Sequence, residues 1–314
     1  MPDDGRSGCR TQQEGDVVLM ASVLITGAEG FTGRYVAQAL RARGHQVSSL
    51  VRCCDQPKPD VYACDLQDRA GLAEVVARVR PDWVVHLAAI SFVGHGNPGE
   101  IYATNVVGSR NLLEALAAGE KKPSAVLLAS SANIYGAGPL GLPIPETAPY
   151  RPANDYAVSK VALEYMAQLW TDRLPIIMVR PFNCIGVGQS LSFLVAKMAD
   201  HFRRRAPVIE LGNRDVARDF SDVRWVADVY CRLLEKAPVG EVFNVCSGHA
   251  VTLTHVLQTM STITGHDIEA RTNPNFVREH EVKSQCGDNR KLMGAIGQLE
   301  APTLDDTLQW LLSE

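Results

Sequence analysis

The fold of this chain is decided by the stretch Ser22-Val-Leu-Ile-Thr26-Gly27-Ala28-Glu29-Gly30-Phe31-Thr32-Gly33. A short aliphatic run leads into three glycines with the spacing G-x-x-G-x-x-G, and a helical pattern follows. In such a strand–turn–helix unit, one glycine makes the tight turn, one lets the backbone approach a diphosphate, and one lets helix and strand pack closely. The helix N-terminus then offers N–H groups to the anion. The stretch therefore predicts a dinucleotide-binding turn; the simpler alternative is an ordinary glycine-rich turn.

Outward from this turn, short apolar runs alternate with helical segments. Strands are expected at residues 22–26, 46–51, 83–87, 125–129, 175–179 and 241–245. Helices are expected at residues 30–43, 70–80, 99–118 and 155–172. Continuous apolar strands that alternate with helices are typical of a parallel sheet covered on both faces. The pattern predicts an α/β fold of Rossmann type, with a doubly wound parallel sheet.

The regular alternation ends after Pro181. We expect a disordered tail at residues 1–20 and a dinucleotide-binding domain at residues 21–183 plus 223–250. Residues 184–222 plus 251–314 would form a smaller C-terminal α/β lobe that binds the substrate over the ends of the strands, where sites of this fold lie.

Composition excludes several classes of protein. Among 314 residues, 31 are Lys or Arg and 35 are Asp or Glu, so the net charge is −4, and 46% are hydrophobic. These values argue against a disordered chain and against a nucleic-acid surface. The eight cysteines form no C-x-x-C pair, so neither zinc nor any other metal is expected. No signal peptide is evident and no apolar run approaches the ~20 residues of a membrane span, so we expect a cytoplasmic protein without a membrane partner.

Three polar residues form a candidate catalytic group. Tyr156 and Lys160 are four residues apart on one predicted helix, and Ser131 follows the strand at 125–129. A phenol has a pKa of about 10, so a nearby cation is needed to make it an effective proton donor and acceptor at neutral pH. Ser131, Tyr156 and Lys160 would meet at the sheet edge that carries the glycine turn.

Together these residues resemble the extended short-chain dehydrogenase/reductase family, from Ser22 to the C-terminus. The matching elements are Gly27, Gly30, Gly33, His86-Leu-Ala-Ala89, Asn105-Val-Val-Gly108, Ser131, Tyr156, Lys160 and Arg180-Pro-Phe-Asn183. The resemblance implies that Ser131 hydrogen-bonds the reacting oxygen and that Tyr156 transfers the proton. Lys160 would hold the nicotinamide ribose and depress the Tyr156 pKa, and Asn105 would shape the site behind them.

The cofactor is expected to be NADPH, with NADH possible. The usual acid at the end of the second strand is absent, and Arg52 could pair with a 2′-phosphate there. The alternative is a solvated arginine. Asp65 suits a contact with the adenine edge. The expected cofactor contacts are Gly27, Gly30, Phe31, Thr32, Gly33, Arg52, Asp65, Leu66, Leu87, Ala88, Ala89, Asn105, Tyr156 and Lys160.

Motifs in the second half narrow the resemblance to the GDP-4-keto-6-deoxy-D-mannose reductases. They are Arg180-Pro-Phe-Asn-Cys-Ile-Gly186, Gly188-Gln189, Ser192-Phe193, Arg218-Asp-Phe-Ser-Asp-Val223, Asn244-Val-Cys-Ser-Gly248 and Gly287-Asp-Asn289. The resemblance implies that Arg218 and Arg278 grip the substrate diphosphate. The expected substrate contacts are Ser91, Phe92, Asn183, Ser192, Arg218 and Arg278.

Simpler roles exist for three of these residues. Arg218 could form a salt bridge with Asp215 or Asp222. Arg278 could likewise pair with its sequence neighbours Glu279 and Glu281. Cys184 departs from the pattern, and we expect a buried structural thiol there.

Three reactions share this scaffold. A 4,6-dehydratase needs an acid and a base beside the catalytic serine, and this chain has Ala132-Asn133 there. Arg52 and the resemblance of the second half favour the reductase. The resemblance implies NAD(P)H-dependent reduction of the 4-keto group of a nucleotide-linked 4-keto-6-deoxy sugar, from GDP-4-keto-6-deoxy-D-mannose to GDP-D-rhamnose. The alternatives are an NAD-dependent nucleotide-sugar 4-epimerase and a non-catalytic nucleotide-sensing regulator.

The predicted helix 155–172 is apolar over most of its circumference, as is typical of a helix buried on two sides. The family resemblance implies a homodimer formed by this helix and the long helix before it. The alternative is that the chain's own second lobe covers the helix.

Overall fold

The computed structural model of the chain describes residues 20–54, 56, 58–91, 96–137, 142–277 and 282–314. The predicted tail thus lies outside the described residues except for Met20. Within the described part, no helix combines the length and the apolar character needed to cross a bilayer.

A parallel sheet of seven strands forms the centre of the molecule, in the order β10-β6-β5-β4-β1-β2-β3. The strands are β1 (Ser22–Thr26), β2 (Gln46–Val51), β3 (Val61–Ala63), β4 (Trp83–His86), β5 (Ala125–Ala129), β6 (Ile176–Pro181) and β10 (Val242–Val245). The order reverses between β1 and β4, where Thr26 pairs with His86. Ligands bind at such a switch point, beyond the carboxyl ends of the strands.

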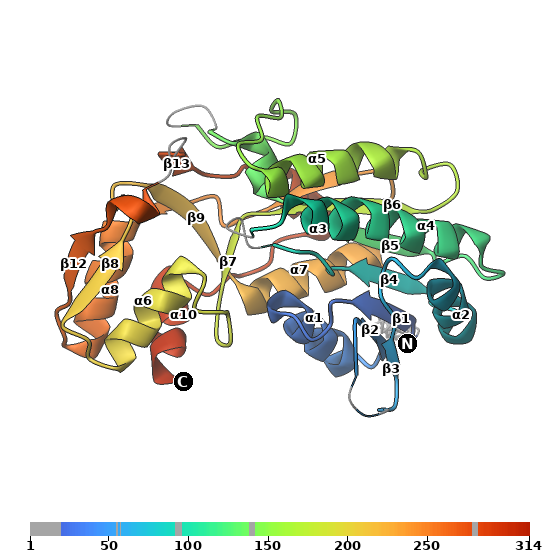
Figure 1. Cartoon of the computed structure of the whole chain (residues 1–314), viewed down its shortest axis with the longest axis horizontal. Coiled ribbons are helices and arrows are strands. Elements are labelled where there is room, and N and C mark those ends of the chain that lie inside the picture. Colours follow the sequence, from blue (N-terminus) through green and yellow to red (C-terminus); the bar gives the residue numbers. More distant parts are fainter. Residues whose placement is uncertain (1–19, 55, 57, 92–95, 138–141, 278–281) are drawn as a thin grey trace, which may run out of the picture.

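Helices cover both faces of this sheet (Figure 1). One face carries α1 (Phe31–Ala42), α7 (Val223–Lys236) and α9 (Arg290–Ile296); the other carries α2 (Arg69–Val79), α4 (Ser109–Ala118) and α5 (Asp155–Gln168). Successive side chains of a strand point to opposite faces. Accordingly Val23 and Ile25 join one core, and Leu24 joins the other. The doubly wound Rossmann-type prediction is confirmed.

The second half of the chain supplies smaller sheets beside the carboxyl ends of the strands (Figure 1). They contain β7 (Asn183–Ile185), β9 (Ala217–Asp222), β11 (Ala250–Thr252) and β13 (Ser284–Gln285), and separately β8 (Val208–Leu211) and β12 (Glu269–Thr272). Helices α6 (Leu194–Arg203), α8 (Leu253–Thr264) and α10 (Leu304–Ser313) enclose their own apolar core. Because α9 packs against α7, the chain returns to the main sheet before α10 begins.

The helix predicted at residues 99–118 is divided into three parts. They are α3 (Pro98–Tyr102), a π-helical turn η1 (Ala103–Gly108) and α4. Single π turns inside helices are frequent at functional sites. Here the turn carries Asn105, which is almost completely buried.

Candidate active site

The glycine turn is built for close approach of the backbone. Gly27 has φ +72°, and a Cβ there would lie 2.8 Å from the Ala88 nitrogen. A Cβ on Gly33 would collide with the Gly27 carbonyl oxygen. Helix α1 begins after Gly30, and no side chain caps its N-terminus. An uncapped helix end beside small residues fits a dinucleotide diphosphate, and Phe31 and Thr32 lie in its first turn.

Behind the turn, a buried histidine joins β1 to the helix after β4. Ser109 Oγ donates its proton to the Asn105 carbonyl (2.7 Å), so it accepts from His86 Nε2–H (2.8 Å). His86 Nδ1 is then the acceptor for Thr26 Oγ1–H (2.6 Å). Burial, and secondarily the charge of Lys160, lower the His86 pKa to about 3. A neutral imidazole with both nitrogens bonded therefore fixes this end of the sheet.

Asn105 extends the network to the helix of the catalytic group. Its Oδ1 accepts from Ile90 N (2.8 Å), and its Nδ2 donates to Ile90 O (3.1 Å) and to Ser159 Oγ (3.0 Å). Ser159 Oγ in turn donates to the Tyr156 carbonyl (2.7 Å). Both ends of the Asn105 amide are thus engaged within the protein, and the residue supports the strand ends and α5.

The structure brings Ser131, Tyr156 and Lys160 together, each less than a tenth exposed. Ser131 follows β5 and caps the 3-10 turn η2 (Ala132–Tyr135). A side-chain hydrogen bond joins it to Tyr156. Lys160 Nζ donates to the Ala129 carbonyl (2.7 Å) and lies 5.8 Å from the centre of the Tyr156 ring.

Burial dominates the titration of these groups. It lowers the Lys160 pKa to about 8, and the Glu164 carboxylate acts in the opposite direction. Burial also raises the pKa of Tyr156, and the Ser131 hydrogen bond lowers it by less. The expectation that Lys160 depresses the Tyr156 pKa is therefore corrected for the protein as described. The desolvation of the phenol outweighs its stabilising contacts.

A buried ion pair that was not predicted from the sequence joins α5 to β6. Arg180 Nη2 lies 2.6 Å from Glu164 Oε2, with both side chains 4% exposed, and Arg180 Nε donates to Glu164 Oε1 (2.9 Å). Arg180 also donates to the hydroxyls of Tyr135 (2.7 Å) and Tyr150 (2.8 Å). The available signal was Glu164, which lies four residues after Lys160 and so on the same helix face.

The remaining expected cofactor contacts line the carboxyl ends of the strands. Arg52 follows β2 and is exposed, without an ion pair to any described residue. Asp65 is exposed after β3, and its Oδ1 accepts from Gln67 N (2.8 Å). Leu66 is buried against Gly108. After β4, Leu87 and Ala88 donate their N–H groups to Thr26, and Ala89 is partly exposed.

Four of the six expected substrate contacts lie in the described part of the chain, two on strands and two in loops. Asn183 on β7 donates through Nδ2 to the Asp219 carbonyl (3.1 Å), and Arg218 is partly exposed on the neighbouring β9. Ser91 and Ser192 are exposed in loops. The other expected contacts, Phe92 and Arg278, lie outside the described residues.

Asp222, one of the two alternative ion-pair partners of Arg218, has other partners in the structure. Its carboxylate instead binds Arg224 (2.6 Å) and accepts from Thr307 Oγ1 (3.0 Å).

A second missed residue is Asp219, whose side chain is fully buried on β9. Its carboxylate accepts from Ser247 Oγ (2.7 Å) and from the backbone nitrogens of Ser247 (2.8 Å), Gly248 (3.0 Å) and Gly287 (3.2 Å). Burial raises its pKa, and these bonds lower it. Asp219 thereby joins β9 to the loops after β10 and β13. The sequence feature that could have indicated Asp219 is its place directly after Arg218 in the motif Arg218-Asp-Phe-Ser-Asp-Val223.

Cys184 on β7 makes a side-chain hydrogen bond with Thr32, and desolvation raises the pKa of its thiol. Its side chain is only partly buried, which corrects the expectation of a buried thiol. A thiol with a raised pKa is a poor nucleophile, which agrees with a structural role. Among the described residues, no group of three His, Cys, Asp or Glu side chains could hold a metal ion.

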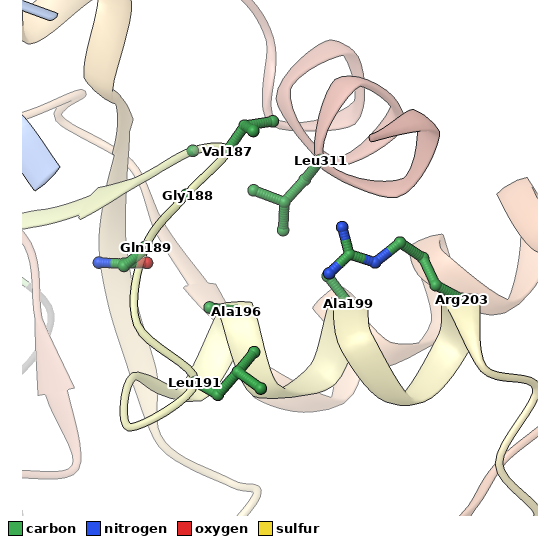
Figure 2. A pocket seen from close by; sticks show the side chains of 9 residues that line it. Val187, Gly188, Gln189, Leu191, Ala196, Ala199, Arg203 and Leu311 are labelled. Carbon is green, nitrogen blue, oxygen red and sulfur yellow. The ribbon is translucent and has the colours of Figure 1, made fainter. Parts of the chain in front are cut away.

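The loop after β7 connects the two halves of the molecule. Arg34 Nη2 donates to the Gly188 carbonyl (2.8 Å) and Tyr35 Oη to the Val187 carbonyl (2.9 Å), so α1 holds this loop from one side. On its other side lies a cavity of about 30 Å³ bordered by α6 and α10, with Arg203 and Leu311 in its lining (Figure 2). It has room for about one water molecule and contains none of the catalytic group.

Comparison with known proteins gives the family. The model of the NAD dependent epimerase/dehydratase family matches residues 23–246. GDP-6-deoxy-D-talose 4-dehydrogenase of Aggregatibacter actinomycetemcomitans is 32% identical over 88% of this chain and 91% of its own. GDP-6-deoxy-D-mannose reductase of Pseudomonas aeruginosa is 33% identical over 93% of this chain and 96% of the reductase.

Solved structures agree with this likeness. The crystal structure described as a "putative epimerase" from Burkholderia cenocepacia J2315 is 49% identical to this chain and has a TM-score of 0.87. The match covers 93% of this chain and 96% of the other. RMD from Pseudomonas aeruginosa, complexed with NADPH, is 32% identical with a TM-score of 0.82, and the match covers 93% of this chain and 98% of that one. With the glycine turn, the parallel sheet and the buried Ser131–Tyr156–Lys160 group, the chain belongs to the NAD dependent epimerase/dehydratase family.

Proposed function

We propose that this chain reduces the 4-keto group of a nucleotide-linked 4-keto-6-deoxy sugar with NAD(P)H, converting GDP-4-keto-6-deoxy-D-mannose to GDP-D-rhamnose. One observation carries the proposal: Tyr156 is hydrogen-bonded to Ser131 and flanked by Lys160, at the strand edge that also bears the glycine turn. The names of the two relatives at 32% and 33% identity support a GDP-linked deoxysugar as substrate.

The bound nicotinamide would supply the hydride for C4 of the sugar. Tyr156 gives its phenolic proton to the oxygen of the keto group, so the carbonyl gains one hydride and one proton and becomes an alcohol. Ser131 donates a hydrogen bond that stabilises the negative charge developing on that oxygen. Lys160, with a pKa of about 8, supplies a positive charge beside the phenolate at neutral pH. Tyr156 is then reprotonated for the next turnover.

The residues beside Ser131 favour reduction over dehydration. Ala132 is buried, and Asn133 offers an amide rather than a carboxylate. Neither side chain can remove a proton from carbon or protonate a leaving hydroxyl, which elimination of water requires. The same positions do not separate a reductase from a 4-epimerase, so the two must be separated by how much cofactor is oxidised during turnover. A reductase consumes one NADPH for each product, whereas an epimerase interconverts two sugars with no net oxidation of cofactor.

The direct test is turnover by the purified chain. GDP-4-keto-6-deoxy-D-mannose and NADPH should give GDP-D-rhamnose, with loss of absorbance at 340 nm in equal amount. GDP-mannose and UDP-glucose serve as controls, because neither carries a 4-keto group. Interconversion of UDP-glucose and UDP-galactose without net oxidation of cofactor would replace the reductase by the epimerase.

We also propose a cytoplasmic homodimer formed through α5 and the preceding helix. Val158, Tyr165 and Leu169 are 39%, 57% and 79% exposed along α5 and its C-terminal end, and Val107 on the adjacent η1 is 50% exposed. The chain's own second lobe therefore leaves this apolar face open. Light scattering should give twice the mass of one chain, and Leu169→Lys should reduce it to that of a monomer. A monomeric wild-type chain at micromolar concentration would exclude the dimer.

A further inference from the structure

The Ser131 hydroxyl receives two hydrogen bonds from one neighbour. The backbone nitrogen of Asn133 donates to Ser131 Oγ over 3.2 Å, and the side-chain Nδ2 of Asn133 donates to the same atom over 3.1 Å. The first bond is the ordinary cap of a 3-10 turn. The second bond is specific to an amide side chain at position 133.

These two bonds set the direction of the Ser131 proton. A hydroxyl has one hydrogen to donate and two lone pairs with which to accept. Both lone pairs of Ser131 Oγ face N–H groups of Asn133, so its hydrogen must be donated elsewhere. The remaining side-chain partner is Tyr156. Tyr156 therefore accepts from Ser131 and keeps its own phenolic hydrogen available for a substrate oxygen.

We propose that Asn133 is a positioning residue that fixes Ser131 as an obligate hydrogen-bond donor, first to Tyr156 and then to the oxygen that is reduced. The identity of that oxygen rests on the proposed function, but the polarity of the Ser131–Tyr156 bond does not. An aspartate of the same shape would reverse this polarity, because a carboxylate has no hydrogen and would accept the Ser131 proton.

Two variants of Asn133 separate its possible roles. Asn133→Leu keeps a similar volume but removes the donor, and Asn133→Asp turns the donor into an acceptor. We expect kcat to fall about tenfold for the leucine variant and about a hundredfold for the aspartate variant, with KM changed less than about threefold. Unfolding temperatures measured alongside show whether either variant has lost its fold.

The double-mutant cycle with Ser131→Ala tests whether Asn133 acts through Ser131. In the Ser131→Ala background, Asn133→Leu should cause no further loss of single-turnover reduction, because the hydroxyl that it orients is absent. Equal losses in both backgrounds would show that Asn133 acts independently of Ser131 and would overturn the proposal.

A readout besides activity is the titration of Tyr156, followed by NMR with tyrosine labelled at Cζ and assigned with Tyr156→Phe. The ionisable groups that face Tyr156 are Lys160 on its own helix and Tyr230 on α7, and both are unchanged in these variants. Loss of the Ser131 donor should move the titration of Tyr156 to higher pH in Asn133→Asp, and less so in Asn133→Leu.

These outcomes distinguish the inference from the proposed function. If wild type reduces no 4-keto sugar, the proposed function fails while the NMR titration still decides the polarity of the Ser131–Tyr156 bond. If wild type is active and both variants match it in kcat and in Tyr156 titration, the positioning role of Asn133 is wrong.

Discussion

The proposed catalytic group and the proposed substrate lobe hold their polar residues in different ways. Around Tyr156, a buried network of side chains and two main-chain carbonyls, those of Asn105 and Tyr156, runs from Thr26 through His86, Ser109, Asn105 and Ser159. In the lobe, one carboxylate on β9, that of Asp219, collects N–H and O–H groups from two loops. The first arrangement places the proposed catalytic atoms on the sheet, and the second places the strands proposed to bind the substrate relative to it. Changes in the first region should affect kcat, and changes in the second should affect KM.

The largest effect is expected at the phenol itself. Tyr156→Phe removes the proton donor and leaves the glycine turn untouched, so turnover should fall by about a thousandfold while NADPH still binds. Stopped-flow reduction and fluorescence titration of NADPH measure the two quantities. Reduction at a near-normal rate would remove Tyr156 from the proton-transfer role.

The contrasting change in the lobe is Asp219→Asn. It replaces an acceptor-only group by an amide whose NH₂ would face the donors of Ser247, Gly248 or Gly287. The loops beside Arg218 should shift, raising the KM for the nucleotide sugar about tenfold with kcat changed less than about threefold. Asp215→Asn, an exposed acid in the same segment, is the matched control. A loss confined to kcat would contradict the division between the two regions.

A smaller and more selective effect is expected at Arg52. Because this exposed arginine follows β2, we expect Arg52→Ala to raise the KM for NADPH about tenfold and the KM for NADH less than about twofold. Arg41→Ala, which removes an exposed arginine of α1, should change neither value. Equal effects of Arg52→Ala on both cofactors would exclude contact with a 2′-phosphate.

A different kind of effect, on stability rather than on activity, is expected in acid. His86 has a folded-state pKa of about 3 against an ordinary 6.5, so the unfolded chain binds the proton more readily between those values. This contribution to the free energy of unfolding is present above about pH 6.5 and is lost as the pH falls toward 3, by at most about 1.4 kcal/mol per pH unit. Urea unfolding from pH 7 to pH 4 should show a shallower decline for His86→Gln. The exposed-residue control His255→Gln should follow wild type.

Local patterns predicted most of the fold, because each buried parallel strand is a short apolar run and each covering helix has its own periodicity. The predicted strand at residues 22–26 and the helix after Gly30 match β1 and α1 closely. The π turn at Ala103–Gly108 could not be predicted from the helical pattern, because helix continues on both sides of it. The group Ser131, Tyr156 and Lys160 was predictable because its members follow a strand end and share a helix face.

What the sequence could not show depends on contacts between distant residues. Arg180 finds Glu164 only after β6 and α5 pack together, and Asp219 finds Ser247 and Gly287 only after the lobe closes on the sheet. The direction of the Tyr156 pKa likewise follows from burial, which no spacing reveals. Such non-local contacts also create the difference between the network around Tyr156 and the single carboxylate of Asp219 that joins two loops.

The central proposal is tested most directly by following the hydride. The wild-type chain is incubated with GDP-4-keto-6-deoxy-D-mannose and NADPH that carries deuterium at both C4 positions of the nicotinamide. We predict one deuterium at C4 of the sugar product and one NADP⁺ formed per product. A product without deuterium, or sugar conversion without net oxidation of NADPH, would contradict a 4-ketoreductase.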